Sequence, residues 1–291
     1  MKILLVLAVA VVVAVSGFPS CTNLGPSQLL CQVFLGGTHF CPATSCAQIA
    51  QTRVWDAKDG YYWLTTDNDV SQVYCAHSIT PREPRGWMRV GLIDAKTSCP
   101  SDLAYFVAGN RKVCRKTVNA GCSSVTFKSN GISYSKVCGR VYGYADRTVD
   151  GFKIHGVCRG LKKCTIDQPY MDGVSITHGR PRQHVWTLAA STFSSLGQCP
   201  CSDNPKLTAP RPYVGGDYYC DIEKSGTFLD EDRLWDGKSC SVGGEACCKR
   251  ANWFCKDLPQ PTNEDIEFRL CADQVRRDED VYIEFAEIYV Q

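Results

Sequence analysis

The sequence contains no long apolar run after its first 17 residues. A membrane-spanning helix needs roughly 18 consecutive apolar residues, and the run from Ile3 to Val15 is shorter than that. A surplus of one charge sign is also lacking, since 32 Lys plus Arg stand against 30 Asp plus Glu. Such a balance provides no long-range field that would attract a nucleic acid or an anionic lipid surface. We therefore expect neither a nucleic acid nor a membrane among the partners.

Two common catalytic signatures are absent from the chain. It has no G-x-S-x-G segment for a nucleophilic serine and no H-E-x-x-H segment for a catalytic zinc ion. Because the cysteine content favours disulfides, a free catalytic thiol is not expected either. A triad assembled in space around His184 is the alternative that these motifs do not address. We expect a protein that is not an enzyme.

What the chain has in abundance is cysteine, with 19 residues that all lie beyond residue 17. Residues 1–17, with Lys2 before the apolar run, have the pattern of a secretory signal peptide. In an oxidising compartment so many cysteines form disulfides, so we expect a secreted, extracellular, disulfide-rich protein. Because 19 is odd, one cysteine is left over. It either stays buried or links two chains into a disulfide-bonded homodimer.

The cysteine spacing does not favour a metal site. The closest pairs are Cys199-Pro-Cys201 and Cys247-Cys248, and neither is the C-x2-C arrangement that presents two thiolates to one zinc ion. Adjacent cysteines rarely bond to each other, so Cys247 and Cys248 should reach different partners. We expect no metal and no cofactor. Calcium is the alternative at three acidic loops, whose charge runs are otherwise typical of solvated turns: 67–70, 230–233 and 276–281.

Three parts are expected along the chain. A signal peptide (1–17) precedes a short cysteine-rich segment (18–44) and a single disulfide-rich β domain (45–291). Ser45 can cap a short helix through about Gln51. Short segments rich in Val, Ile, Phe and Tyr, separated by Gly, Pro, Asp and Asn, predict strands at 61–66, 86–94, 123–129, 136–145, 172–178, 184–190, 265–271 and 281–290. The expected fold class is β-dominated, an α+β fold with few short helices.

A group of short motifs occupies residues 45–94. Cys46 is followed 29 residues later by Cys75, with GYYWL between them, VYC at the second cysteine and GWMRV after it. In this order the motifs resemble the opening of fibrinogen C-terminal-like domains, as in ficolins and intelectins. The resemblance implies a distantly fibrinogen-like fold and a disulfide between Cys46 and Cys75. The calcium site and acetyl-group pocket of that family have no counterpart here, so no lectin pocket is carried over.

Further motifs extend to the end of the chain, among them SCPSDLAYF, ISYSKVCGRVYGY, CPC, LWDGKSC and the ending EIYVQ. Together they resemble a family of secreted cysteine-rich proteins of corals and sea anemones. The family has no established activity, although fibrinogen-like proteins of this kind are associated with extracellular and skeletal organic matrix. The resemblance implies a non-enzymatic, matrix-associated structural or interaction component. The alternative is a soluble lectin-like recognition module that binds glycans or anionic ligands.

The segment DGVSITHGRPRQHVW has the pattern of a hairpin with a polar tip. A loop over Gly179–Gln183 gives one strongly apolar face, which favours this register. It places three pairs opposite each other: His178 and His184, Ile176 and Trp186, Val174 and Leu188. A four-residue loop would instead pair Ile176 with Val185 and give a less apolar face.

The tip of this hairpin carries the candidate ligand-binding residues. Opposed imidazoles, with Cβ atoms about 5 Å apart, could share a metal ion, but the sequence identifies no third ligand. Arg180 and Arg182, fixed by Pro181, could instead present planar donors to a carboxylate, sulfate or phosphate. The alternative is that the histidines bond backbone groups and the arginines are only solvated. The candidate site is therefore His178, Arg180, Arg182 and His184, with no metal.

Overall fold

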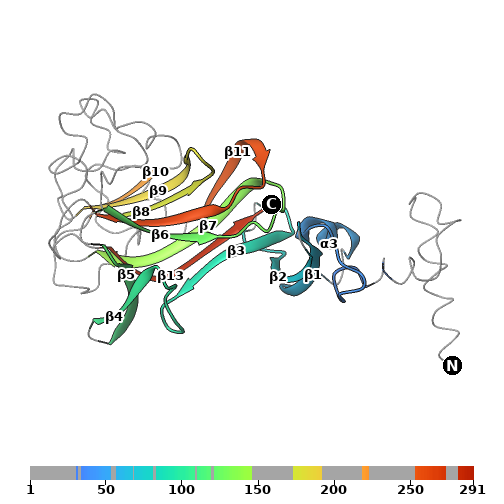
Figure 1. Ribbon diagram of the computed structural model, residues 1–291, viewed down its shortest axis with the longest axis horizontal. Helices are drawn as coiled ribbons and strands as arrows, with labels where there is room; N and C mark the ends of the chain where they lie inside the picture. The colour runs from blue at the N-terminus through green and yellow to red at the C-terminus, as the bar shows by residue number, and fades with distance from the viewer. Residues whose placement is uncertain are drawn as a thin grey trace, which may run out of the picture.

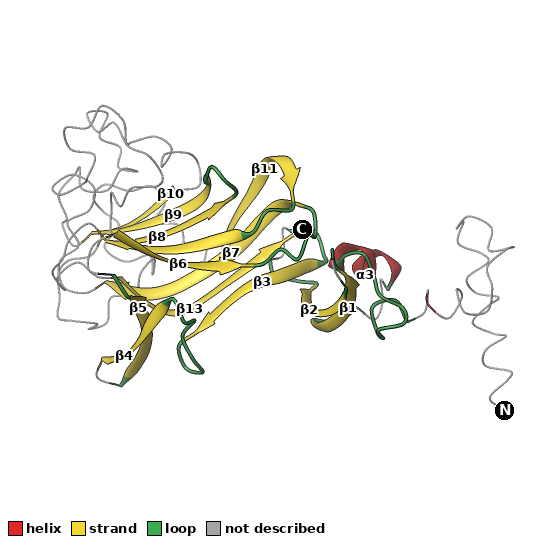
Figure 2. Cartoon of the chain, in the orientation of Figure 1, coloured by secondary structure: helices red, strands yellow, loops and turns green. Residues whose placement is uncertain are grey.

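The computed structural model describes residues 31, 34–53, 57–67, 69–80, 83–108, 110–118, 121–145, 173–191, 218–222, 253–272 and 281–291. Within these ranges the chain forms two β-sheets that lie face to face, preceded by the short helix α3 (Cys46–Thr52) (Figure 1). Strands make up most of this fold (Figure 2). No helix in these ranges is long and apolar enough to cross a lipid bilayer. The expectation of a β-dominated, disulfide-rich fold is confirmed.

The large sheet has eight strands. Six of them follow one another in the order β1 (Gly60–Thr65), β2 (Val70–Ala76), β3 (Trp87–Asp94), β13 (Val281–Val290), β5 (Arg111–Lys116) and β4 (Leu103–Ala108). β7 (Tyr134–Ala145) pairs with β13, and β11 (Phe254–Thr262) pairs with β7. The last strand of the chain, β13, is therefore the centre of this sheet, while β4 is one of its edges.

The small sheet has five strands. Their order is β10 (Tyr218–Ile222), β9 (Gln183–Ser191), β8 (Gly173–His178), β12 (Ile266–Ala272) and β6 (Gly121–Phe127). β12 lies between β6 and β8 and pairs antiparallel with both. The β8–β9 hairpin, which carries the predicted site, therefore has β12 as its direct neighbour.

Apolar side chains of the two sheets meet between the layers. Trp186 of β9 stacks on Phe254 of β11, with ring centroids 4.3 Å apart and an interplanar angle of 11°. Phe268 of β12 and Ile288 of β13 belong to the same buried cluster and are fully shielded from solvent. Burying one such side chain contributes about 1.5 to 3 kcal/mol relative to leaving it exposed. This layer is therefore what holds the sheets together.

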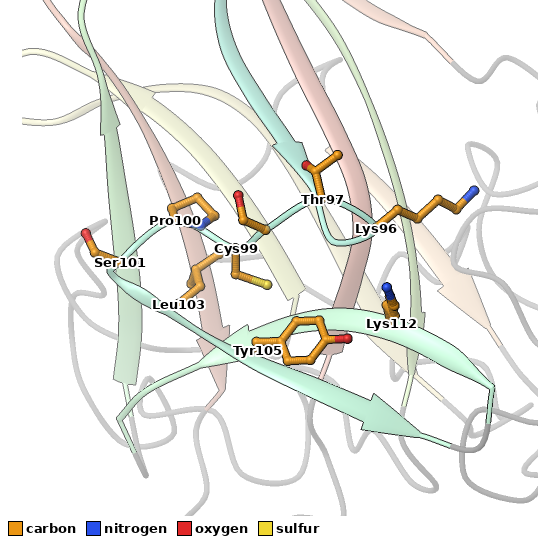
Figure 3. A pocket seen from close by; sticks show the side chains of 9 residues that line it. Lys96, Thr97, Cys99, Pro100, Ser101, Leu103, Tyr105 and Lys112 are labelled. Carbon is orange, nitrogen blue, oxygen red and sulfur yellow. The ribbon is translucent and has the colours of Figure 1, made fainter.

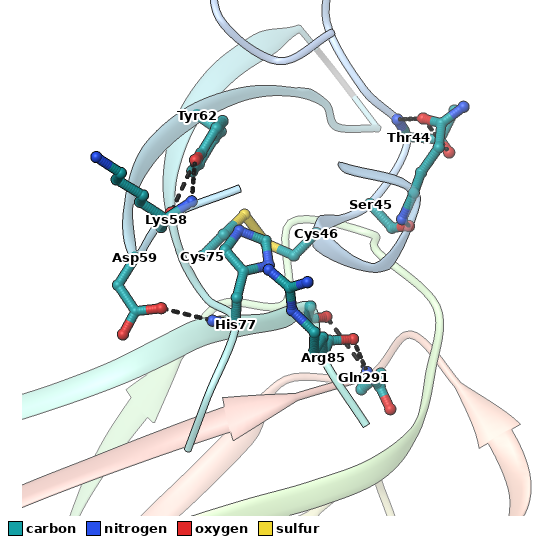
Figure 4. Close-up of a disulfide and its surroundings, with 12 residues drawn as sticks. Thr44, Ser45, Cys46, Lys58, Asp59, Tyr62, Cys75, His77, Arg85 and Gln291 are labelled. Carbon is teal, nitrogen blue, oxygen red and sulfur yellow. Dashed lines mark hydrogen bonds between the residues drawn. A yellow bond between two sulfur atoms is a disulfide. The ribbon is translucent and has the colours of Figure 1, made fainter. Parts of the chain in front are cut away.

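The helix α3 is capped at its N-terminus and joined to the sheet by a disulfide. The Ser45 hydroxyl accepts a backbone N–H of the first turn at 3.0 Å, which is the N-cap expected from the sequence. A disulfide between Cys46 and Cys75 joins the helix to β2, and it is the pair that the resemblance implies (Figure 4).

Beside this bond His77 is 4% exposed. Burial, followed by the charge of Arg85, lowers the pKa of His77.

The segment before the helix lies against β1. The Trp63 N–H donates to the Gly36 carbonyl at 2.8 Å, and the Ala43 N–H donates to the Trp63 carbonyl at 3.0 Å. Residues 34–43 are thus hydrogen-bonded to the first strand of the domain. The expected division of the chain at residue 45 stays a prediction.

Among the described residues, five disulfides use ten of the 19 cysteines. They are Cys31–Cys41, Cys46–Cys75, Cys99–Cys114, Cys122–Cys271 and Cys138–Cys255. The last two join directly opposed residues of neighbouring strands, β6 with β12 and β7 with β11. The side chains of the other nine, including Cys199, Cys201, Cys247 and Cys248, lie outside the described residues. The odd cysteine and the disulfide-bonded homodimer therefore stay predictions.

The β8–β9 hairpin follows the expected register only in part. Two apolar pairs are as predicted, Val174 opposite Leu188 and Ile176 opposite Trp186. A register shift then places the remaining pairs differently, with Thr177 opposite His184 and His178 opposite Gln183. The prediction that His178 lies opposite His184 is therefore wrong.

The register shift coincides with two buried neighbouring side chains on β9. Val185 is the extra residue on β9, and both Val185 and Trp186 are 0% exposed. In a regular strand two successive side chains point to opposite faces, whereas a β-bulge re-aims one of them. The bulge therefore accompanies the burial of both neighbouring side chains. It leaves a loop of four residues, 179–182, in place of the expected five.

Candidate anion-binding site

Arg182, at the tip of the β8–β9 hairpin, is bound by a carboxylate of the neighbouring strand. Its Nε donates to Glu267 Oε2 at 2.5 Å, and its second contact reaches Glu267 Oε1 at 3.1 Å. Thr177 also donates to Glu267 Oε2, at 3.2 Å. Burial alone would raise the pKa of Glu267. The hydrogen bond from Arg182 acts in the opposite direction, and the pKa of Glu267 lies below its ordinary value. The guanidinium thus already has an internal anion, so an external one would have to displace it.

Because of the register shift, the two histidines of the predicted site do not lie opposite each other. His178 is 5% exposed, and its Nδ1 lies 2.8 Å from Glu264 Oε2. His184 contacts the Thr187 hydroxyl, with 3.4 Å between Nδ1 and Oγ1. Burial, with a smaller effect from Lys256, lowers the pKa of His184 to about 4. The structure therefore gives each imidazole its own surroundings and does not bring the pair together.

Arg180 differs from Arg182 because it is exposed at the turn. It forms no ion pair with any residue in the part of the chain that the structure describes. Of the four predicted site residues, Arg180 is thus the one whose charge faces solvent. A ligand-binding role for the set of four stays a prediction.

The structure also bears on the metal alternatives. Among the described residues, Glu83, Cys138 and Cys255 bring three possible ligand atoms within 4.8 Å of one another. The two sulfur atoms are bonded to each other, so neither is a thiolate that could bind an ion. Of the acidic loops, 230–233 and nearly all of 276–281 lie outside the described residues. Calcium binding stays a prediction.

A second basic cluster, which was not predicted from the sequence, lies on the β4–β5 hairpin and the loop before it. Residues 96–118 contain five basic side chains and one acidic side chain. The basic ones are Lys96, Arg111, Lys112, Arg115 and Lys116, and the acidic one is Asp102. This short segment therefore carries a net charge of +4, while the whole chain carries +2.

Two of these arginines lie over aromatic rings. The guanidinium carbon of Arg111 is 4.3 Å from the ring centre of Tyr144, and that of Arg115 is 4.8 Å from the ring centre of Phe106. Neither arginine has a carboxylate within ion-pair distance in the described ranges, and the same holds for Lys112. Stacking restrains a guanidinium plane while leaving its edge N–H groups able to donate. The hairpin thus presents cations that no carboxylate of the described ranges neutralises.

A surface depression of about 420 Å³ lies beside these cations. Figure 3 shows Lys112 and Tyr105 of the hairpin facing the loop that carries Lys96 and Thr97. Ser98 and Ser101 add hydroxyl groups to its lining. The Tyr105 side chain is 50% exposed, and the Lys96 ammonium lies 3.6 Å from Glu284. The lining therefore combines cations, hydroxyl donors and an exposed aromatic face.

The chain holds this loop and the hairpin together covalently. Cys99 of the loop is bonded to Cys114 of β5, so the Lys96 side of the depression is attached to the Lys112 side. In β5, Cys114 and Val113 are fully buried, whereas the flanking basic residues are partly or fully exposed. The letters RKVCRK at 111–116 are the sequence signal that could have identified this strand.

The arrangement suits an anionic ligand with several charges. Guanidinium and ammonium groups bind sulfate, carboxylate or phosphate through charge-assisted hydrogen bonds. Hydroxyl groups and an exposed tyrosine ring add contacts of the kind used for sugar rings. The lining consists of lysines, hydroxyl groups and apolar side chains.

Comparison with known proteins gives one similarity. No known protein-family profile matches the chain, and no solved structure matches it. Conotoxin Mr15.2 of Conus marmoreus is 43% identical over 74 residues, which are 25% of this chain and 72% of the conotoxin. The similarity and the five disulfides indicate a cysteine-rich, secreted protein. The resemblances to fibrinogen-like domains and to coral and sea anemone proteins stay predictions, whereas over that quarter of its length the chain belongs to the family of this conotoxin.

Proposed function

We propose that the protein is a secreted, non-enzymatic binding component of extracellular material that holds a sulfated polysaccharide on the β4–β5 hairpin. The observation that carries the proposal is the set of cations Arg111, Lys112 and Arg115, none of which has a carboxylate partner among the described residues. Unpaired cations gathered at one place attract a polyanion even where the net charge of the chain is small.

The spacing of the cations supports a chain-like ligand. Arg111 and Arg115 lie four residues apart on one face of β5, which corresponds to about 13 Å along an extended strand. Lys112 points to the other face, toward the depression with Tyr105 (Figure 3). A single small anion cannot contact both faces, whereas a polysaccharide that carries repeated sulfate groups can pass over the hairpin. The exposed Tyr105 ring is suited to pack against a sugar ring.

Retention on a sulfated matrix tests this function. The variant Arg111→Ala/Lys112→Ala/Arg115→Ala should elute from heparin at lower salt and bind roughly tenfold more weakly, because three exposed ion pairs contribute about 0.2 to 1 kcal/mol each. The matched control Arg89→Ala/Lys136→Ala/Arg180→Ala removes the same charge elsewhere and should elute close to the wild-type protein.

Three results would contradict the proposal. The first is equal elution of both variants, which would show a net-charge effect alone. The second is loss of retention only in the control, which would favour Arg180 and the β8–β9 tip. The third is failure of the wild-type protein to bind heparin or dextran sulfate while it binds phosphate-bearing polymers such as RNA. Circular dichroism of each variant shows whether the fold is intact.

Location distinguishes the two forms of this function. A matrix component should remain in the insoluble extracellular fraction after washing in physiological salt and leave it in high salt. A soluble recognition module should stay in the medium and bind to members of an array of sulfated glycans. The proposed site is the same in both cases, so the hairpin variant should lower both readouts.

The similarity to a conotoxin favours a second candidate, a toxin-like action on animal cells. Purified protein added to cultured animal cells should then change their viability or ion flux, and protein with reduced and alkylated cysteines should not. Equal effects of the two preparations, or no effect of either, would remove this candidate.

A further inference from the structure

The β4 strand forms an edge of the large sheet that no other strand covers in the described ranges. It reads LAYFVA and contains no charge, no glycine and no proline. β5 lies on one side of it, and the hairpin projects from the body of the sandwich (Figure 1). An edge of this kind offers backbone N–H and C=O groups to another strand.

Another edge of the same sheet is protected, which makes the contrast informative. β11, which pairs only with β7 in the sheet, contains Pro259 and Pro261 together with Lys256 and Asp257. Its register is also irregular between Asp257 and Thr262. Proline, charge and irregular pairing are the usual means by which an edge strand avoids pairing with another chain. β4 has none of them.

The exposed side chains of β4 form a self-complementary pattern. Tyr105 is 50% exposed and Val107 is 49% exposed, and because they are two residues apart they lie on the same face. An antiparallel pair with a two-fold axis at Phe106 places Phe106 opposite Phe106 and Tyr105 opposite Val107 of the second copy. Each exposed apolar side chain then gains an apolar cross-strand neighbour.

We propose that β4 pairs with β4 of a second copy of this chain, in antiparallel register centred on Phe106. The large sheet then continues from one copy into the other as a closed two-fold dimer. A second copy is favoured over a foreign strand because the same two side chains, Tyr105 and Val107, supply both halves of the contact. This dimer needs no intermolecular disulfide and does not depend on the polysaccharide function.

The charges of β5 give the dimer a characteristic salt dependence. The two β5 strands would be three strand spacings apart, about 14 Å. Arg111, Lys112 and Arg115 of one copy therefore repel those of the other at low ionic strength. At physiological salt the screening length is about 8 Å, so most of this repulsion disappears. Dimerisation should strengthen as salt is added, whereas binding of a sulfated polysaccharide should weaken.

Sedimentation of the full chain tests the proposal. The wild-type protein should be a reversible dimer across a dilution series of about two decades around micromolar concentration. Tyr105→Lys/Val107→Lys places like charges opposite each other and should raise the dissociation constant at least tenfold. The control Tyr61→Lys/Leu92→Lys changes two exposed side chains away from β4 and should leave the dimer intact.

A charge swap tests the register itself. Tyr105→Lys/Val107→Glu places lysine opposite glutamate only if the pair is centred on Phe106, and it should restore dimerisation relative to the double-lysine variant. The proposal is overturned if the wild-type protein is monomeric throughout, or if the double-lysine variant dimerises as well as the control. Failure of the swap to restore the dimer would overturn the register. Heparin retention of the wild-type protein, loaded at a concentration well below its dissociation constant, separates this outcome from the proposed function.

Discussion

The two basic hairpins of this protein differ in how their charges are neutralised. In the β8–β9 hairpin, Arg182 is held by Glu267 and His178 by Glu264. In the β4–β5 hairpin, Arg111 and Arg115 lie over aromatic rings, with no carboxylate in ion-pair range among the described residues. Basic residues near a turn therefore do not by themselves make a binding site. What matters is whether the fold has already supplied the anion.

The largest expected effect tests how deeply each hairpin is anchored. Trp186→Ala removes the ring that stacks on Phe254 and should lower the free energy of unfolding by about 3 to 5 kcal/mol. Tyr105→Ala in β4 removes a half-exposed side chain and should cost less than about 1 kcal/mol. Urea unfolding followed by circular dichroism measures both. Equal losses would contradict the view that one hairpin is part of the core and the other peripheral.

The strand-rich fold could be predicted because its signal is local. Alternating apolar residues identified most strands. The requirement for one apolar face also predicted that Ile176 lies opposite Trp186. The bulge at Val185 could not be predicted in the same way. It lies where both Val185 and Trp186 are buried in a core built from distant segments, and sequence periodicity does not contain those contacts. A prediction from periodicity treats every strand as regular. It therefore continued the register beyond Ile176 and Trp186 and placed His178 opposite His184.

The candidate site depended on contacts that sequence spacing does not contain. Glu264 lies 86 residues after His178, and Glu267 lies 85 residues after Arg182. Nothing in HGRPRQH therefore indicates that Arg182 is occupied. The opposite error was made for β5. Its basic segment RKVCRK was overlooked because the charge of the whole chain is nearly balanced. The sum of charges limits long-range attraction, but it does not show which charges lack a partner.

An intermediate effect is expected from mild acid on the β8–β9 hairpin. The pKa of His184 is about 4 in the folded protein, against an ordinary value of 6.5. Below pH 6.5 the unfolded chain therefore takes up the proton first. Stability is fully present above pH 6.5 and is lost as the pH falls toward 4. At pH 5 this linkage amounts to a loss of about 2 kcal/mol.

Urea unfolding at pH 7 and pH 5 measures this loss. The variant His184→Gln cannot titrate at that position and should lose less stability between the two pH values than the wild-type protein. The lowered pKa of His77 acts in the same direction, so a smaller loss remains in the variant. Identical losses in the variant and the wild-type protein would show that the His184 ring is not shielded by the hairpin.

The smallest effect compares one arginine from each hairpin. Arg182→Ala leaves the Glu267 carboxylate without its two guanidinium contacts and should lower the free energy of unfolding by about 1 to 2 kcal/mol. Arg111→Ala should change it by less than about 0.5 kcal/mol, because within the described ranges the residue contacts the Tyr144 ring and no carboxylate. On heparin the order should reverse, with Arg111→Ala weakening retention and Arg182→Ala leaving it unchanged. An Arg182→Ala variant that keeps full stability and loses retention would reassign the binding site to the β8–β9 tip.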